Sequence, residues 1–172
     1  MNTIDAGFER YCQERFPLPS EEQIANLESR LSVLLPPSYR QFIAKYNGGF
    51  FCEPTIRSEE RDCPTDRLTF LGGFNPTHPT AQLGGGSISP KMFDDNYPVL
   101  ILPIGYTIMG NLLFIVTDPA GDDRGWIELK IAFQQKSYFL AETMEDFFGL
   151  LSDPPNFKYL DGIPSTVGPK LR

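Results

Sequence analysis

The fold is decided by one stretch, residues 35–49, which read LPPSYRQFIAKYNGG. Two successive prolines separate it from the segment before, because Pro36 cannot continue a helix whereas Pro37 fits the first turn of the next one. Apolar side chains then recur every three or four residues, which predicts a helix with one buried face. Asn47 and the two glycines after it tolerate the left-handed backbone that ends a helix, so this helix should stop there.

A second helix is expected upstream of this one. Residues 20–23 read SEEQ, a capping box in which the Ser and Gln side chains satisfy free backbone N–H groups. Spacings of three and four residues then align one apolar stripe, formed by Ile24, Leu27, Leu31 and Leu34. Because Pro36 stops this helix, the two helices should form a hairpin that turns at the Pro-Pro pair.

The middle of the chain has a different character. Residues 53–67 form a charged loop ahead of a short strand candidate at 68–71, and residues 72–96 are rich in Gly, Pro and Ser. Loops this long are uncommon inside compact domains and are usually functional or mobile. We expect residues 72–96 to be partly ordered over the edge of a sheet.

The second half of the chain predicts strands, because apolar runs recur with short turns between them at 97–104, 111–117, 126–133 and 138–140. Short connections favour an antiparallel meander. A last helix starts with Thr143 as its N-cap, buries Met144, Phe147, Phe148 and Leu151, and ends at Pro154-Pro155.

Helices followed by strands and a closing helix indicate an α+β fold. We therefore expect an N-terminal helical hairpin and a C-terminal helix packed on a central, mainly antiparallel β-sheet. The 172 residues fit one domain over 1–172, with a core at about 20–151 and an irregular tail at 152–172. The 14 Phe predict a core rich in aromatic rings.

Charge and cysteine content exclude several classes of function. The chain has 15 Lys and Arg against 22 Asp and Glu, a net charge of −7, and its basic residues do not cluster. Direct nucleic-acid binding is therefore not expected, whereas cationic partners would be favoured. Three widely spaced cysteines suit a reducing compartment, and the sequence has neither a membrane-length apolar run nor a signal peptide. These features predict a cytoplasmic protein without membrane association.

No motif in the chain specifies a reaction. Residues 85–89 read GGSIS, which lacks the last glycine of a nucleophile elbow, so a hydrolase using Ser87 and the single histidine, His78, is a distant alternative. The cysteines lack zinc spacing, and the acidic turn after residue 117 lacks the calcium-loop pattern. We expect no catalytic residues, no cofactor and no metal.

Residues 35–49 resemble the signature of the SUKH superfamily (the Smi/Knr-type domain), with Ile43 in place of the usual Leu. Pro103-Ile104-Gly105, Gly125-Trp126-Ile127 and the segment 140–148 are similar to later parts of the family pattern, in the correct order over about 20–151. Thr143 and Met144 depart from the usual Ser-Phe. The motif residues taken as structural are Leu35, Pro36, Tyr39, Phe42, Asn47, Gly48, Gly49 and Trp126.

The resemblance implies a domain without enzymatic activity. Such domains in bacteria commonly act as immunity proteins that neutralise polymorphic or contact-delivered toxins, often nucleases, whereas fungal relatives are regulatory scaffolds of cell-wall assembly. A cognate protein toxin is therefore the expected partner, and the scaffold is the alternative. Oligomeric state stays open. Exposed acids and one aromatic in loops beside the sheet are the candidate partner contacts: Asp94, Asp95, Tyr97, Asp118, Asp122 and Asp123.

Overall fold

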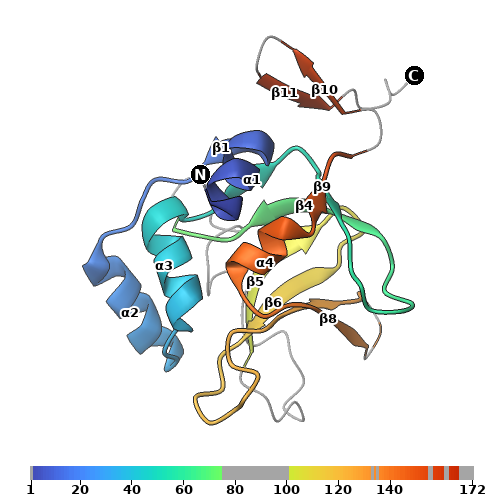
Figure 1. The fold of residues 1–172 in the computed structure, drawn as a ribbon. Coiled ribbons are helices and arrows are strands. Elements are labelled where there is room, and N and C mark those ends of the chain that lie inside the picture. Colours follow the sequence, from blue (N-terminus) through green and yellow to red (C-terminus); the bar gives the residue numbers. More distant parts are fainter. Residues whose placement is uncertain are drawn as a thin grey trace.

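The computed structural model describes residues 2–74, 101–132, 134, 136–154, 157–160 and 163–166 (Figure 1). The helices are α1 (Thr3–Tyr11), α2 (Glu21–Leu31), α3 (Pro37–Tyr46) and α4 (Met144–Gly149). The strands are β1 (Cys12–Arg15), β2 (Gly49–Phe51), β3 (Thr55–Ile56), β4 (Asp66–Leu71), β5 (Ile101–Thr107), β6 (Leu112–Val116), β7 (Ile127–Lys130), β8 (Ser137–Ala141), β9 (Leu151–Ser152), β10 (Phe157–Leu160) and β11 (Ile163–Thr166).

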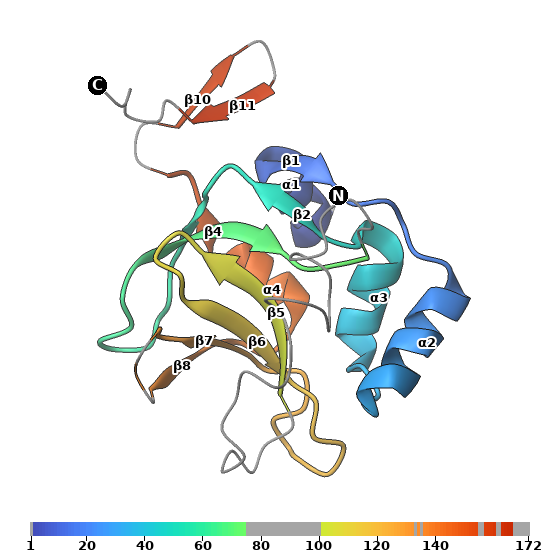
Figure 2. The ribbon, with the colours of Figure 1, turned by 180° about the vertical axis from the view of Figure 1, so that it is seen from behind.

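Nine of these strands form one antiparallel sheet. Its main path runs β1-β2-β4-β5-β6-β7-β8, while the short strand β3 joins β4 to β9. The strands β5 to β8 follow one another as a meander, with Leu102 opposite Ile115 and Ile115 opposite Ile127. Figure 2 shows the sheet from behind, with α4 on its far side. The α+β class and the antiparallel meander are therefore confirmed.

The core between helices and sheet is largely aromatic. Phe8 of α1 lies at its centre, with ring centroids 6.1 Å from Phe42, 5.6 Å from Phe51 and 6.1 Å from Phe148. These residues come from α1, α3, β2 and α4, so one cluster of rings joins three helices to the sheet. The core is therefore rich in aromatic rings, as the phenylalanine content predicted. Burial of large aromatic side chains contributes strongly to stability.

The helical hairpin forms as expected, with one difference at its turn. Ser20 and Gln23 make both hydrogen bonds of the capping box, and Pro37 begins α3. However, α2 ends at Leu31, because Ser32 adopts the left-handed conformation at φ 54°. Leu34 consequently lies outside the apolar stripe and is 66% exposed.

Residues 47–49 end α3 differently from the prediction. Of these three residues, only Asn47 has a positive φ, of 65°. The two glycines are required for space instead, because a Cβ on Gly48 would lie 2.5 Å from the Leu71 carbonyl oxygen and one on Gly49 would lie 2.4 Å from that of Glu14. Gly49 is paired with both β1 and β4, so these glycines let the chain enter the sheet between two strands.

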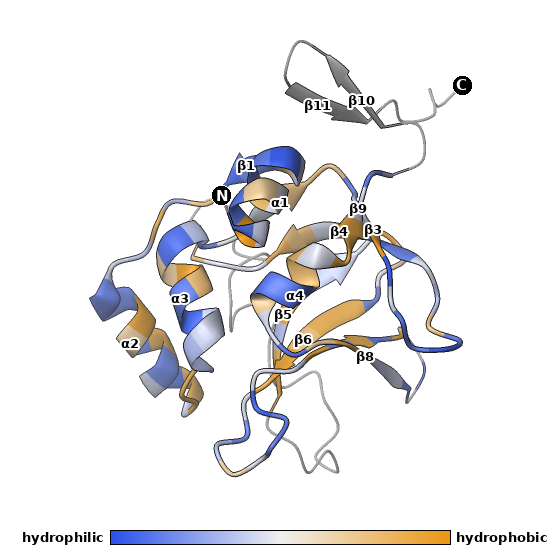
Figure 3. Cartoon of the chain, viewed as in Figure 1, coloured by the Kyte–Doolittle hydropathy of each residue, from blue (hydrophilic) through white to orange (hydrophobic). Residues whose placement is uncertain are grey.

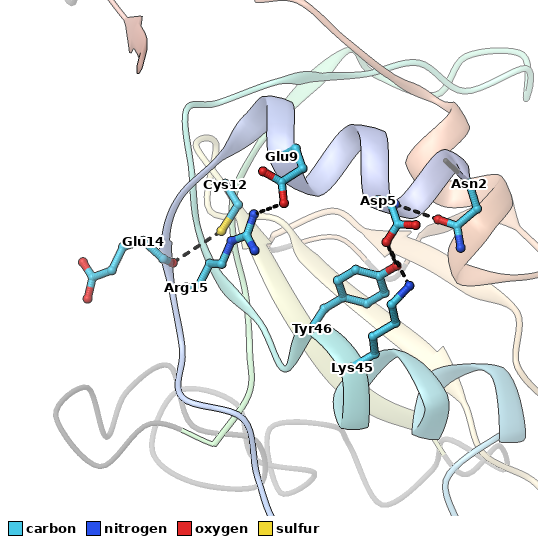
Figure 4. Close-up of polar contacts among 8 residues, drawn as sticks. All are labelled: Asn2, Asp5, Glu9, Cys12, Glu14, Arg15, Lys45 and Tyr46. Atoms are coloured by element: carbon cyan, nitrogen blue, oxygen red, sulfur yellow. Dashed lines mark hydrogen bonds and ion pairs between the residues drawn. The ribbon is translucent and has the colours of Figure 1, made fainter. Parts of the chain in front are cut away.

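Helix α1 and strand β1 were not predicted. Asn2 caps α1 by accepting a hydrogen bond from the Asp5 amide, and Asp5 in turn accepts from Lys45 Nζ at 2.9 Å and from the Tyr46 hydroxyl (Figure 4). These bonds, the Tyr46 one above all, lower the pKa of Asp5. The N-terminal segment is thereby attached to α3.

Three further expectations were wrong in part. The charged loop at 53–67 contains β3 and the start of β4, and α4 ends at Gly149 rather than at the Pro-Pro pair. The tail at 152–172 is not irregular throughout, because β10 and β11 pair as an antiparallel hairpin. In this hairpin Lys158 lies opposite Ser165, and Leu160 lies opposite Ile163.

Candidate functional site

The loop between β6 and β7 brings together three of the predicted contact residues, Asp118, Asp122 and Asp123. Asp118 Oδ1 accepts a hydrogen bond from the Ala120 amide at 2.9 Å. The loop is closed by the Gly125 amide, which donates to Val116 at 2.9 Å. Asp122 is exposed and the other two aspartates are partly exposed, so their charges are available at the surface.

The other predicted residues are not described by the structure. Asp94, Asp95 and Tyr97 lie outside the described residues, and so do Ser87 and His78 of the hydrolase alternative. The same holds for all but the first three residues of the 72–96 loop.

The loop between β6 and β7 is attached to the turn of the helical hairpin. The Arg124 guanidinium donates to the Leu34 carbonyl oxygen at 3.2 Å. Gly125 adopts φ +100°, and a Cβ there would lie 3.6 Å from Pro36 Cβ. The motif that decides the fold therefore also positions the acidic loop, although it carries none of the candidate contacts itself.

A negative region extends from this loop across the sheet to the loop between β3 and β4. Burial raises the pKa of Glu128 on β7, a hydrogen bond with Ser137 partly offsets this, and the nearby charges of Asp123 and Glu60 raise the pKa further. Each of these carboxylates therefore disfavours ionisation of the group between them. Lys136 is a cation beside this region, since the charges of Asp62 and Glu60 contribute to raising its pKa.

Two aromatic rings lie within this region. Trp126 and Phe139 meet edge to face with centroids 4.8 Å apart, and Phe139 on β8 is opposite Glu128 in the register. Phe139 is 38% exposed and is the aromatic residue among the five exposed large apolar side chains of the described residues. Exposed aromatic residues surrounded by polar groups are typical of protein-binding surfaces.

A cavity of about 540 Å³ adjoins Phe139. Its walls come from α4, β8 and the loop between β3 and β4, which Figure 3 shows as a hydrophilic segment beside hydrophobic strands. Its acidic lining residues are Glu59, Glu60, Glu142, Glu145 and Asp146, and none of the described residues that line it is Lys, Arg or His. We call this cavity, together with Asp123, Trp126, Glu128 and Phe139, the acidic surface.

The carboxylates of the cavity differ from six acidic groups that form ion pairs elsewhere in the described chain. Asp5, Glu9, Glu21, Glu28, Glu53 and Asp153 all lie within 4.0 Å of a basic side chain, as Figure 4 shows for Glu9 with Arg15. None of the five cavity carboxylates has such a partner among the described residues. Asp146 accepts a bond from the Thr143 hydroxyl at 2.6 Å, which neutralises no charge. The cavity therefore presents five carboxylates without a direct ion pair among the described residues, and the nearby charge of Glu60 contributes to raising the pKa of Lys136.

The cysteines offer little for thiolate chemistry. Burial raises the pKa of Cys12 to about 12 and that of Cys52 to about 11. Both thiols are protonated at neutral pH and are poor nucleophiles and metal ligands in that form. Among the described residues no group of three or more His, Cys, Asp or Glu is arranged to hold a metal ion.

Sequence reasoning missed the cavity. Its carboxylates come from residues 59–60 and 142–146, and the strands β4 to β8 lie between these two segments along the chain. The alternation along β7 places Trp126 and Glu128 on one face and the buried Ile127 and Leu129 on the other, which shares the core with α4. Nothing in the sequence, however, brings residues 59–60 next to residues 142–146. None of the helices in the described residues is both long and apolar enough to traverse a bilayer.

Comparison with known proteins agrees with this architecture. The model of the SMI1 / KNR4 family (SUKH-1) matches residues 18–149, which include the helical hairpin and the sheet as far as α4. A curated relative is the SPbeta prophage-derived uncharacterized protein YokK of Bacillus subtilis (strain 168), which is 28% identical over 167 residues, covering 89% of this chain and 82% of the relative. No solved structure matches. Because the family model matches most of the length of the chain, this chain belongs to the SMI1 / KNR4 family (SUKH-1).

Proposed function

We propose that this chain is a non-catalytic, protein-binding domain of the immunity type, which neutralises a cationic protein toxin by covering its active face. The observation that carries the proposal is the acidic surface, where a cavity with unpaired carboxylates adjoins the exposed ring of Phe139. Membership of the SUKH-1 family supports the same role, because immunity proteins are common in the superfamily that the sequence resembles.

The chemistry of the surface favours a cationic partner. Nuclease toxins bind nucleic acid through clustered Lys and Arg, and carboxylates can occupy the positions that phosphates would take. A ring such as Phe139 can in addition pack against an arginine side chain. Charge of this kind mainly accelerates association and selects the partner, whereas the buried contacts around the aromatic pair slow dissociation.

Co-expression tests the proposal. The product of the gene beside this one is produced in cells with and without this chain, and we expect growth only when this chain is present. Growth arrest in both cultures, with this chain folded and abundant, would contradict the immunity role. Growth in both cultures would also contradict it and would favour the regulatory scaffold.

A double variant distinguishes the binding mechanism from the hydrolase alternative. A chain carrying Ser87→Ala and His78→Ala should rescue growth as well as the unchanged chain, because the proposed mechanism uses neither side chain. Loss of rescue by a stably folded double variant would support the hydrolase instead.

A further inference from the structure

Strand β8 leaves its outer edge unpaired among the described residues. It ends the main path of the sheet and pairs only with β7 there. The carbonyl oxygen of Phe139 accepts a hydrogen bond from the Ser58 hydroxyl, so it points away from β7. The N–H and C=O of one residue in an antiparallel strand face the same side, so the Phe139 amide points outward as well.

The bond that Ser58 makes to this edge is weak. Its length is 3.4 Å, whereas hydroxyl donors usually lie about 2.7 to 2.8 Å from their acceptors. An incoming backbone amide can therefore replace it at little cost. Exposed strand edges present a row of donors and acceptors that pair readily with another extended chain.

The edge also opens onto the cavity. Phe139, Leu140 and Ala141 of β8 line it, and its volume of about 540 Å³ is enough for several residues of an extended segment. Carboxylates from two segments line the cavity beside the edge, with Glu59 and Glu60 on the loop between β3 and β4 and with Glu145 on α4. Alternate side chains of an added strand point to opposite faces, so they can approach both segments.

We propose that β8 binds an extended, Lys- or Arg-rich segment of the partner protein as an additional antiparallel strand. This inference rests on the proposed function and specifies its mode of binding. Main-chain hydrogen bonds to the outer edge of β8 hold the segment, and its cationic side chains pair with the carboxylates that line the cavity. The negative charge of the cavity carboxylates favours a positively charged segment as the added strand.

A second copy of the same chain fits this edge poorly. Pairing of β8 with β8 would bring two cavities together, each lined by five carboxylates and by no basic side chain among its described residues. Like charges at close range oppose such a dimer. A cationic partner removes that repulsion.

The test uses the full chain and a defined probe, an acetylated and amidated nonapeptide of alternating arginine and threonine. The control peptide has the same side chains and charge, but all its backbone nitrogens are methylated so that it cannot donate main-chain hydrogen bonds. Affinity is measured at low salt, and hydrogen exchange of the Phe139 amide is followed by NMR. We expect the unmethylated peptide to bind at least tenfold more tightly and to slow exchange of that amide at least tenfold.

A paired variant checks the charge component. Glu59→Gln with Glu145→Gln should weaken binding of the probe at least fivefold, whereas Glu14→Gln with Glu22→Gln removes the same charge from β1 and α2 and should leave binding unchanged. Equal affinity of the two peptides, or absence of binding, would overturn strand addition. Protection of the Phe139 amide in the free chain, or protection that grows with protein concentration alone, would show that the edge is already occupied and would overturn it too.

Failure of this inference is distinguishable from failure of the proposed function. If this chain rescues cells from the toxin but the Phe139 amide exchanges freely in the toxin complex, strand addition is wrong and the immunity role stands. If the peptide binds as predicted but no rescue occurs, the binding mode is right and the biological role is wrong.

Discussion

Asn47 and Phe74 are joined by two reciprocal hydrogen bonds. Asn47 Nδ2 donates to the Phe74 carbonyl oxygen at 2.9 Å, and the Phe74 amide donates to Asn47 Oδ1 at 2.8 Å. The same Nδ2 also donates to the Pro17 carbonyl oxygen. Because Asn47 is fully buried, one side chain satisfies backbone groups of two other segments where water has no access. The asparagine of the family motif is therefore structural.

Replacement of Asn47 should destabilise the fold strongly. Asn47→Gly keeps access to the left-handed backbone but leaves buried backbone groups without partners, so we expect the free energy of unfolding to fall by about 2 to 4 kcal/mol. Denaturant unfolding measures the change. Ser32→Gly is the matched control, because Ser32 also ends a helix with positive φ but is exposed, and it should change stability by less than about 0.5 kcal/mol. Equal effects of the two substitutions would refute a role for the Asn47 side chain.

The contact between α1 and α4 should tolerate alanine at one glycine and not at the other. A Cβ on Gly7 would lie 2.6 Å from Cδ1 of the Phe148 ring, whereas one on Gly149 meets nothing closer than 3.9 Å. Gly7→Ala should therefore cost about 1 to 3 kcal/mol through overpacking. Gly149→Ala should be neutral or stabilise by up to about 1 kcal/mol, because alanine favours helix. Thermal and denaturant unfolding compare the two, and destabilisation by Gly149→Ala alone would contradict the packing described.

Glu128 should reduce stability at neutral pH. Its pKa is raised in the folded state, so the folded protein resists ionisation of this group more than the unfolded chain does. Glu128→Gln is therefore expected to increase the free energy of unfolding at pH 7. The gain should shrink as pH falls and vanish below about pH 4, where the carboxyl is protonated in both states.

Unfolding titrations between pH 4 and 7 test this sign. Glu22→Gln serves as the control, since Glu22 is exposed in the first turn of α2, where a negative charge favours the helix. It should lower stability slightly at pH 7. A Glu128→Gln variant that is less stable than the unchanged chain at pH 7 would show that Glu128 is held by a favourable contact instead.

Charge reversal in the loop between β6 and β7 should slow association with the toxin. Asp122→Lys with Asp123→Lys reverses charge at one end of the acidic surface, so we expect the association rate constant to fall about tenfold or more at low salt and less at high salt. Stopped-flow measurements at several salt concentrations give the rate. An unchanged association rate would remove both aspartates from the interface.

Much of the fold could be predicted because local signals agreed with the final structure. Ser20 has the capping-box partner that a helix start needs, and β6 is a continuous apolar run buried in the sheet. Helix α1 had local signals as well, because Asn2 is its cap and Ile4, Phe8 and Tyr11 recur at spacings of four and three residues. These signals were weaker, since Gly7 lowers helix propensity and the helix is held in place by contacts with distant residues such as Phe148.

The candidate site was less predictable for the same reason. Asp118, Asp122 and Asp123 share a short turn, so their proximity follows from the sequence. Glu60 and Glu145 come together only through the fold, because β3 and β9 pair and thereby bring the segments on either side of them close. Proximity that arises from strand pairing cannot be predicted from the spacing of residues in the sequence.

The central claim is that the carboxylates of the cavity at β8 bind the cationic face of a protein toxin. Its most direct test is the dissociation constant of the toxin complex, measured by calorimetry for two variants of equal net charge. Glu59→Gln with Glu145→Gln should weaken binding at least tenfold, while Glu14→Gln with Glu22→Gln should leave the dissociation constant within twofold of the unchanged chain. Equal weakening by both variants, or none by the first, would contradict the claim.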